Sequence, residues 1–213
     1  MQPLLILFAK APVPGRVKTR LQTILTADEA SALHEAFVED MLAILASLAL
    51  PTELHVDQPT AHWPAERTGV AHRLQCEGDM GERMRHALED GLARGHSPVA
   101  IVGSDAPDLP AGCLRELVAS GAASGADVTL GPADDGGYYA IVCRRTHPGM
   151  FQGVRWSTEN AFHDTLRACQ ASGLTIASGR MWHDVDVPQD LERLVNPGPH
   201  TQAWLDARRR TGG

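Results

Sequence analysis

A short apolar run near the start of the chain, followed at once by prolines and a glycine, sets the first limits on the fold. Residues 4–8 read Leu-Leu-Ile-Leu-Phe, which is too short to span a membrane and suits a buried strand. Pro12, Pro14 and Gly15 follow, and such residues end regular structure. We expect a buried strand, a loop, and a helix that begins after Gly15 and has residues 18–20 in its first turn.

The same loop concentrates positive charge. Lys10, Arg16, Lys18 and Arg20 lie there with no acidic residue among them, although the chain has a formal net charge of -7. A solvated basic loop is one explanation, but four cations at one break in the chain favour an anion site. Helix N-terminal amides and cationic side chains together bind phosphate. The loop has neither G-x-x-x-x-G-K-[ST] nor G-x-G-x-x-G, which excludes the Walker loop and the usual dinucleotide fingerprint.

Composition limits the class of protein. The 213 residues, of which 43% are hydrophobic, predict one globular domain over residues 1–195, then a tail over 196–213 with a short helix and a frayed end. An isoelectric point near 5.8 argues against nonspecific nucleic-acid binding. We expect no membrane span and no cleavable leader, and therefore a cytoplasmic protein. The four cysteines form no C-x-x-C pair, which favours reduced thiols over a zinc site.

Apolar runs alternate with stretches of helical periodicity. Thr26 and Glu29 form a capping-box pattern ahead of a long amphipathic stretch, which predicts a helix that Pro51 ends. Strands are expected at 52–56, 72–77, 98–103, 127–130, 140–143 and 175–177, with helices between most of them. This alternation predicts an α/β three-layer sandwich with a mostly parallel sheet.

Aspartates follow two of the predicted strands. Asp105 comes directly after the strand at 98–103, at the sheet edge where open α/β folds bind ligands. A carboxylate beside a bound diphosphate requires a divalent cation between them, so Asp105 is a candidate ligand of Mg²⁺ or Mn²⁺. It could instead cap the next helix, and Asp108 is left open as a second ligand. Near the C-terminus we prefer Asp186 to Asp184 as a ligand because Asp186 borders a helix start, although it too could be only an N-cap.

Two glycine-containing turns complete the candidate site. Residues 78–81 join a strand to a helix, with Asp79 as the expected N-cap. Residues 134–137, Asp-Asp-Gly-Gly, are typical of a hairpin loop, and adjacent glycines allow close approach of a ligand. Asp135 could hydrogen-bond a hydroxyl or act as a general base. We expect Tyr138 or Tyr139, the only tyrosines, to face the site.

Five of these segments carry a resemblance to a known group. FAKAPVPGRVKTRL, QCEGDMGERM, GSDAPDLP, GPADDGGYY and DVDVPQDL resemble motifs of the nucleotide-diphospho-sugar transferase (GT-A) superfamily. Within it they resemble a glycosyltransferase-like bacterial subfamily, DUF2064, associated with arsenosugar biosynthesis. The likeness runs from residue 3 to about 195. Val187 stands where threonine is usual, and the neighbouring carboxylates are kept.

The resemblance implies a GT-A fold and a division of roles among the motifs. The nucleotide would be bound by Lys10, Ala11, Pro12, Gly15, Arg16, Lys18, Thr19, Arg20, Asp79, Gly81 and Arg83. The sugar or acceptor would be bound by Asp135, Gly136, Gly137 and Tyr138. The metal would be held by Asp105 and Asp186, and catalytic roles would fall to Asp135 and Lys18.

Three functions are consistent with this pattern. The leading hypothesis is a metal-dependent glycosyltransferase that uses a nucleotide-sugar donor and a small-molecule acceptor, with Lys18 or Arg20 stabilising the leaving diphosphate. The alternative is a nucleotidyltransferase that joins an NTP to a phosphorylated acceptor and releases pyrophosphate. A non-catalytic nucleotide-binding module ranks last because Asp105, Asp135 and Asp186 are all present.

Overall fold

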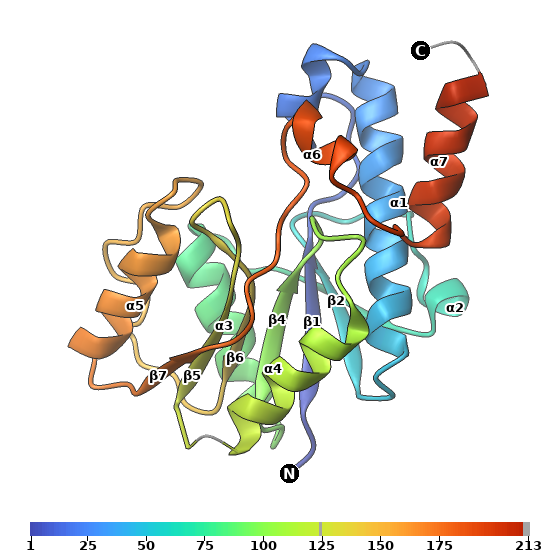
Figure 1. The fold of residues 1–213 in the computed structure, drawn as a ribbon. Coiled ribbons are helices and arrows are strands. Elements are labelled where there is room, and N and C mark those ends of the chain that lie inside the picture. Colours follow the sequence, from blue (N-terminus) through green and yellow to red (C-terminus); the bar gives the residue numbers. More distant parts are fainter. Residues whose placement is uncertain (124, 211–213) are drawn as a thin grey trace.

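The computed structural model contains one seven-stranded sheet of order β3-β2-β1-β4-β6-β5-β7 (Figure 1). The structure describes residues 1–123 and 125–210, with the side chains of residues 66 and 67 excluded. The predicted frayed end at 211–213 lies outside this part. The strands are β1 (Leu4–Ala9), β2 (Thr52–Val56), β3 (Ala71–Leu74), β4 (Val99–Gly103), β5 (Val128–Pro132), β6 (Tyr138–Cys143) and β7 (Ile176–Ser178). The helices are α1 (Ala27–Ala46), α2 (Ala65–Thr68), α3 (Met80–Ala93), α4 (Ala111–Ala123), α5 (Ala161–Ala171), α6 (Pro188–Glu192), α7 (Pro199–Arg210) and the 3-10 helix η1 (Thr19–Thr23).

The sheet is mostly parallel, as predicted. Strands β3, β2, β1 and β4 run parallel to one another, β6 is antiparallel to β4 and β5, and β7 is parallel to β5. Because β6 runs against β4, its first residue, Tyr138, lies at the edge where β4 ends. The turn between β5 and β6 therefore reaches the edge of the sheet at which open α/β folds bind ligands.

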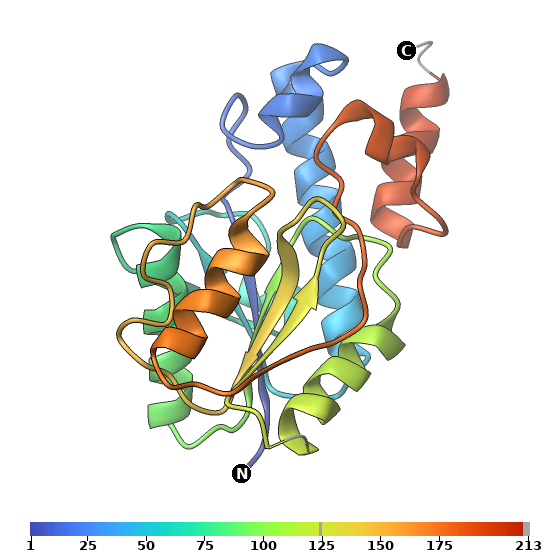
Figure 2. The ribbon, with the colours of Figure 1, turned by 60° about the vertical axis from the view of Figure 1, so that its left-hand side comes forward.

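Helices cover both faces of the sheet and give the predicted three layers (Figures 1 and 2). All six residues of β1 are buried, and they alternate between two clusters. Leu5 and Leu7 pack with α1 and α4, whereas Ile6 and Phe8 pack in a cluster with α3 and with Cys169 of α5. Burial on both faces explains why β1 is uniformly apolar instead of alternating.

A third, smaller apolar cluster lies beyond the edge of the sheet. It joins η1 to the first half of α1, and Val185 and parts of α6 and α7 pack into it. Phe37 of α1 is fully buried there. The cluster therefore holds the basic loop against the C-terminal part of the chain.

The predicted tail helix is α7, which packs along α1 (Figure 1). Asp40, a buried residue of α1, accepts hydrogen bonds from the amides of His200 and Thr201 at 3.0 and 2.8 Å. These amides belong to the first turn of α7, so a carboxylate of α1 satisfies donors that a helix start otherwise leaves free. The capping box of Thr26 and Glu29 is present at the start of α1.

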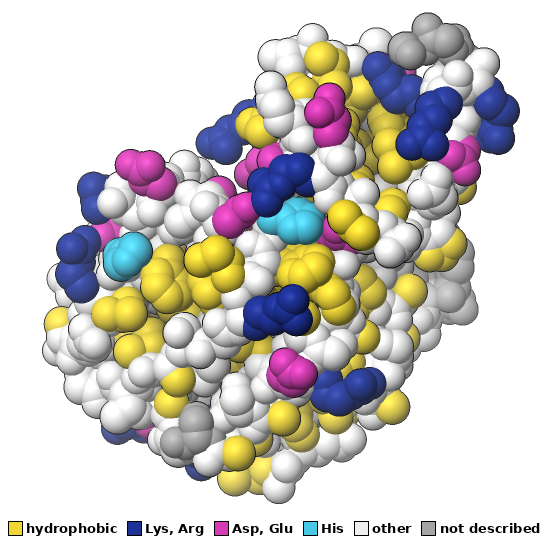
Figure 3. Space-filling view, in the orientation of Figure 1, with side chains coloured by type: hydrophobic (Ala, Val, Ile, Leu, Met, Phe, Trp, Pro, Cys, Tyr) yellow, Lys and Arg dark blue, Asp and Glu magenta, His cyan; other side chains and the backbone are white. Residues whose placement is uncertain are grey.

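The four cysteines are free thiols, as expected, and a charged pair joins the C-terminal segment to the β5–β6 hairpin. Cys113, Cys143 and Cys169 are buried and Cys76 is half-buried. In the described ranges, no helix combines the length and the apolar character that a membrane crossing needs. Arg193, after α6, pairs with Asp134 of the hairpin, and charged side chains gather along this junction in Figure 3.

Glu53 of β2 is the centre of a partly buried ionic cluster at the other end of the sheet. Arg94 contacts both of its oxygens, at 2.6 and 3.0 Å, and Arg73 and His55 each lie 3.0 Å away. Burial alone would raise the pKa of this carboxyl. The arginines and His55 outweigh burial and lower the pKa to about 2.

We predict that Glu53→Gln lowers the free energy of unfolding by about 2 kcal/mol at pH 7, because Arg94 loses a charged acceptor. Since the folded-state pKa of Glu53 lies below its ordinary value of 4.5, this stabilisation is complete above pH 4.5 and is lost as pH falls toward 2. Urea denaturation at several pH values measures the difference between wild type and variant. A difference that stays constant down to pH 2.5 would contradict the ionic assignment. The control is Glu89→Gln, which removes an exposed i,i+4 pair with Arg85 and should cost less than about 0.5 kcal/mol.

Candidate active site

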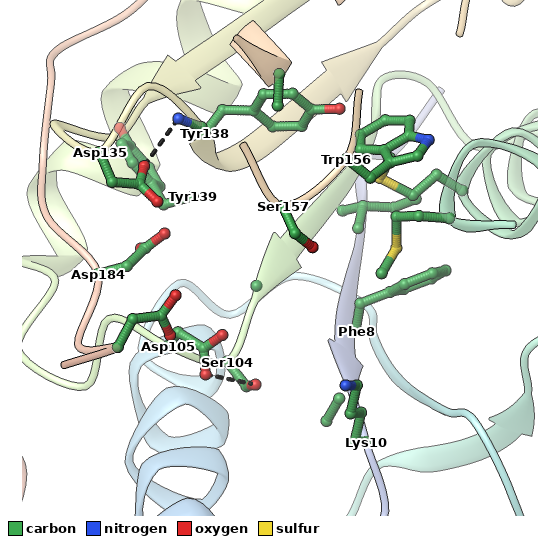
Figure 4. A pocket seen from close by; sticks show the side chains of 18 of the residues that line it. Phe8, Lys10, Ser104, Asp105, Asp135, Tyr138, Tyr139, Trp156, Ser157 and Asp184 are labelled. Atoms are coloured by element: carbon green, nitrogen blue, oxygen red, sulfur yellow. Dashed lines mark hydrogen bonds between the residues drawn. The ribbon is translucent and has the colours of Figure 1, made fainter. Parts of the chain in front are cut away.

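A cleft of about 680 Å³ lies at the carboxyl edge of β1 and β4. Its walls come from the basic loop after β1, the start of α3, the end of β4, the β5–β6 hairpin, residues 156–161 and residues 184–186. Figure 4 shows Asp105, Asp135 and Asp184 on one side of it and Phe8 and Trp156 on the other. The structure thus brings all five sequence motifs to one cavity.

Lys18 lies at the base of the acidic side. Its ammonium is 2.5 Å from Oδ1 of Asp105, 2.6 Å from the carbonyl oxygen of Val185 and 3.4 Å from Oδ1 of Asp186. The same nitrogen sits 5.1 Å from the centre of the Phe37 ring. The Lys18 side chain is 4% exposed, whereas those of Asp105 and Asp186 are 41% and 40% exposed. The lysine is therefore covered by protein, and the two carboxylates remain open to the cleft.

The backbone at Lys18 has left-handed dihedral angles, φ 46° and ψ 40°. Non-glycine residues rarely adopt this conformation, and such outliers gather at functional sites. The residues that follow form the short 3-10 helix η1 instead of the α-helix expected after Gly15. That expectation was wrong because the chain turns at Lys18, and the first α-helix begins only at Ala27.

Charge is crowded around this lysine. Burial opposes ionisation of both Lys18 and Asp105, but their mutual attraction prevails: it raises the pKa of Lys18 and lowers that of Asp105. Burial, with the neighbouring charge of Asp105, raises the pKa of Asp186. Burial and the charges of Asp105 and Asp135 raise the pKa of Asp184 to about 8. This side of the cleft, the acidic wall, consists of Asp105, Asp135, Asp184 and Asp186. It thus holds more carboxyl groups than the single Lys18 ammonium can neutralise.

The rest of the basic loop divides into residues that line the cleft and residues that shape the turn. Lys10, Arg16, Thr19 and Arg20 line it, and Arg20 lies 3.7 Å from Oδ2 of Asp186. The predicted residues Ala11, Pro12 and Gly15 are absent from the lining. The Ala11 amide donates to Oδ1 of Asp57 at 2.7 Å, so it is already satisfied by protein.

The turn before α3 contributes one of its three predicted residues. Arg83 lines the cleft, and its Nε donates to the carbonyl oxygen of Gly78 at 2.9 Å. The Asp79 carboxylate caps α3 by accepting from the amide of Glu82. Gly81 packs against Phe151 and Trp156, where a Cβ would clash. Asp79 and Gly81 therefore shape the helix start.

The β5–β6 hairpin places Asp135, Gly137 and Tyr138 along the cleft. Oδ1 of Asp135 accepts from the Gly137 amide at 2.8 Å, which leaves its other oxygen free for a ligand. Gly136 lies behind them with φ +88°, and a Cβ there would be 2.1 Å from the carbonyl oxygen of Glu159. Gly136 therefore lets residues 156–160 pack closely against the hairpin.

Both tyrosines line the cleft, as expected of at least one, but their hydroxyl groups are directed into the protein. The Tyr138 oxygen accepts from Thr165 at 3.5 Å, and the Tyr139 hydroxyl donates to the carbonyl oxygen of Arg180 at 3.1 Å. Burial raises the pKa of Tyr138 and raises that of Tyr139 to about 12. Neither phenol is suited to proton transfer at neutral pH.

Asp108, left open above as a second metal ligand, has a structural role. Its side chain is fully buried and accepts from Trp182 Nε1, from the amide of Val195 and from the His183 ring, each at 3.2 Å. Helix α5 begins at Ala161, after Asn160. Ser157, in the segment before this helix, has φ 58° and points into the cleft (Figure 4).

The cleft also has an apolar wall, which the sequence did not predict. Phe8, Met80, Met84 and Trp156 form it, and Trp156 also contacts Phe151 and Tyr138 through edge-on ring packing. Phe8 is the last residue but one of a fully buried strand, so the apolar pattern of the strand gives no sign that this side chain meets a ligand.

Known proteins match this chain in sequence and in fold. The family model DUF2064, described as an uncharacterized protein conserved in bacteria, matches residues 41–158. The chain belongs to the DUF2064 family. It is 30% identical over 195 residues to a 2-phospho-L-lactate guanylyltransferase of Methanocella arvoryzae, covering 89% of this chain and 81% of that one.

Solved structures show the fold of this DUF2064 protein. A protein from Desulfovibrio desulfuricans G20, assigned to the nucleotide-diphospho-sugar transferases, has a TM-score of 0.85 and 30% identity, covering 99% of this chain and 96% of that one. A CMP:2-keto-3-deoxy-manno-octonic acid synthetase with CTP has a TM-score of 0.60, 10% identity and coverage of 91% and 96%, which indicates the fold alone. The DUF2064 chain is a transferase with the nucleotide-diphospho-sugar transferase fold, as predicted.

The residues of the acidic wall fit a divalent cation. Carboxylate oxygens are the ligands that Mg²⁺ and Mn²⁺ prefer, and such ions commonly bind one or two carboxylates together with substrate phosphates. Asp105 and Asp186 offer carboxylates to the cleft, and Asp184 lines it beside them. In the described part of the chain, no three His, Cys, Asp or Glu side chains form a metal site by themselves. The donor set is thus suited to an ion that shares its ligands with a phosphate.

We predict that Gly136→Ala lowers the free energy of unfolding by about 3 kcal/mol, because the new methyl group would meet the Glu159 carbonyl in a left-handed turn. Ligand affinity should fall as well, since residues 156–160 line the cleft. Gly15→Ala is the control: it shares the positive φ but has open space around the added atom, so we expect a cost of about 1 kcal/mol. Denaturant titration compares the two variants, and equal losses would refute the close packing.

Proposed function

We propose that this protein transfers a nucleotidyl group from an NTP to a phosphorylated small molecule and releases pyrophosphate. The supporting observation is that a basic loop and an open carboxylate pair line one cleft. The relatives at 30% identity are named as enzymes of this class, 2-phospho-L-lactate guanylyltransferases. A volume of about 680 Å³ lies within the range of small-ligand sites.

Cationic and anionic side chains of the cleft would have different roles. Lys10, Arg16 and Arg20 would bind the triphosphate oxygens through charge-assisted hydrogen bonds. Asp105 and Asp186 would hold Mg²⁺ or Mn²⁺, which when bound neutralises charge on the phosphates. The apolar wall of Phe8, Met80, Met84 and Trp156 offers a surface on which a base or an acceptor can pack.

The reaction needs little help with proton transfer. An oxygen of the acceptor phosphate attacks the α-phosphorus, the bond from that phosphorus to the bridging oxygen breaks, and pyrophosphate leaves with the bonding electrons. A phosphate acceptor is already an anion at neutral pH, so no general base is required. Asp135 would then position the acceptor, whereas a glycosyltransferase would need it to remove a proton from a hydroxyl group.

A glycosyl transfer is the second candidate, because the Desulfovibrio desulfuricans protein is assigned to the nucleotide-diphospho-sugar transferases. The two reactions differ in their products. Nucleotidyl transfer releases pyrophosphate from an NTP, whereas glycosyl transfer releases a nucleoside diphosphate from a nucleotide-sugar.

We predict pyrophosphate release from an NTP, with GTP tested first, when Mg²⁺ or Mn²⁺ and a panel of phosphorylated acceptors that includes 2-phospho-L-lactate are supplied. Asp105→Asn should reduce the rate about 100-fold or more, because the divalent cation that would neutralise the phosphates in the transition state loses a carboxylate ligand. A coupled pyrophosphate assay measures both, and Glu89→Gln, a change on α3 outside the cleft lining, is the control. Release of a nucleoside diphosphate from nucleotide-sugars, without pyrophosphate from any NTP, would replace this proposal with the glycosyltransferase.

We predict a modest effect of Asp135→Asn, about tenfold or less in kcat, if the acceptor is a phosphate that needs no base. A general base contributes about 10²- to 10⁴-fold, so a loss in that range would favour glycosyl transfer to a hydroxyl group. Steady-state kinetics with the acceptor found above supplies the number. The asparagine keeps the hydrogen bond to the Gly137 amide, so the turn should be preserved.

A further inference from the structure

We propose that Lys18 is a built-in counter-ion of Asp105 and Asp186, which makes divalent-cation binding depend on the phosphates of the nucleotide. The lysine acts through the two carboxylates and is a positioning residue. This differs from the phosphate contact that the sequence predicts for it. The inference rests on the proposed nucleotide site, and its test is arranged so that the two can fail separately.

The first argument is the number of hydrogen bonds. A lysine ammonium has three N–H donors and no acceptor. The three acceptors around Lys18 are Asp105 Oδ1, the carbonyl oxygen of Val185 and Asp186 Oδ1. Each donor therefore has a protein acceptor, and none is left for a phosphate oxygen.

The second argument is the direction from which the lysine arrives. Its side chain is 4% exposed and its nitrogen lies over the Phe37 ring, so protein covers it on the side away from the cleft. The left-handed backbone at Lys18 turns the chain at this residue. Burial of a charge is costly unless partners surround it, and here the surrounding groups come from the turn after β4, from α1 and from the segment before α6. The lysine is thus held in place.

The third argument is the contrast with Lys10, since Lys10 and Lys18 are the only lysines in the sequence. Lys10 is exposed and lines the same cleft. Among the described residues it has no ion pair, so its ammonium is available to an incoming anion. Lys10 is therefore placed to bind phosphate, and Lys18 is placed to pair with carboxylates.

A positive charge fixed between the carboxylates has a consequence for the metal. A divalent cation that approaches Asp105 and Asp186 alone meets the nearby Lys18 charge, and like charges repel. Phosphates of a bound nucleotide add negative charge on the cleft side and offset this repulsion. Metal and nucleotide then strengthen each other's binding by the same factor. The site is expected to take the two as a complex and to bind the free ion weakly.

The experiment is a titration of Mn²⁺, followed by electron paramagnetic resonance, into wild type, Lys18→Met and Lys10→Met, with and without GTP. We expect Lys18→Met to bind Mn²⁺ alone about tenfold more tightly than wild type, and to show about tenfold less coupling to nucleotide. Lys10→Met should keep the wild-type affinity for Mn²⁺ alone and lose affinity for nucleotide. Asp105→Asn in the Lys18→Met background should abolish the gain.

Two results would overturn the inference. One is an affinity of Lys18→Met for Mn²⁺ alone that equals or falls below that of wild type. The other is loss of nucleotide affinity in Lys18→Met with unchanged metal binding, which a phosphate contact predicts. The comparison without nucleotide answers the question even if GTP does not bind, so failure of the proposed function is recognised separately.

A measurement on wild type covers the case in which Lys18→Met does not fold. With ¹⁵N-labelled lysine the two side-chain ammonium groups give two signals. The buried Lys18 signal should exchange slowly with water and keep its position when GTP is added without a divalent cation, while the Lys10 signal shifts. A shift of Lys18 with no change at Lys10 would contradict the assignment.

Discussion

The ion pair of Lys18 with Asp105 and Asp186 is the contact on which the arrangement of the cleft depends. It joins the loop after β1, the end of β4 and the segment before α6, which are far apart in sequence. None of these three segments is a regular element at the point of contact. Without a cation the carboxylates of Asp105 and Asp186 would repel each other. The lysine therefore allows the two segments that carry them to approach. The small apolar cluster that contains Phe37 and Val185 packs at the same junction.

The fold was predictable from sequence because apolar periodicity records burial. The uniform run in β1 and the capping box of α1 each indicate an element, and alternation of strands with helices indicates the layers. The position of the site was also predictable, because the acidic and basic motifs follow strands that end at one edge. The sequence could not predict which side chains pair with each other across that edge. The sequence shows Lys18 and Asp105 as members of separate motifs, and only their distance shows that they contact each other.

The errors have a common physical origin. Asp79, Asp108 and Asp105 are all aspartates beside helix starts or strand ends, yet one caps α3, one is buried among the donors Trp182 and Val195, and one faces the cleft. Side-chain chemistry is the same in the three cases, and burial and partners decide the role. The expected helix after Gly15 failed for a related reason: tertiary contacts of Lys18 favour a left-handed turn over continued helix.

The length of chain between the paired residues bears on when the site is assembled. A ribosome makes Lys18 before Asp105, and it makes Val185 and Asp186 after β1 to β6 are complete; α7, which packs on α1, follows them. Domains fold as units during synthesis, beginning from the N-terminal side. A nascent chain that has completed β1 to β6 holds the basic loop and Asp105 without the second carboxylate. The protein therefore acquires its complete charge arrangement only after Asp186 has been synthesised, and a chain that stops before this residue has one of the two carboxylates.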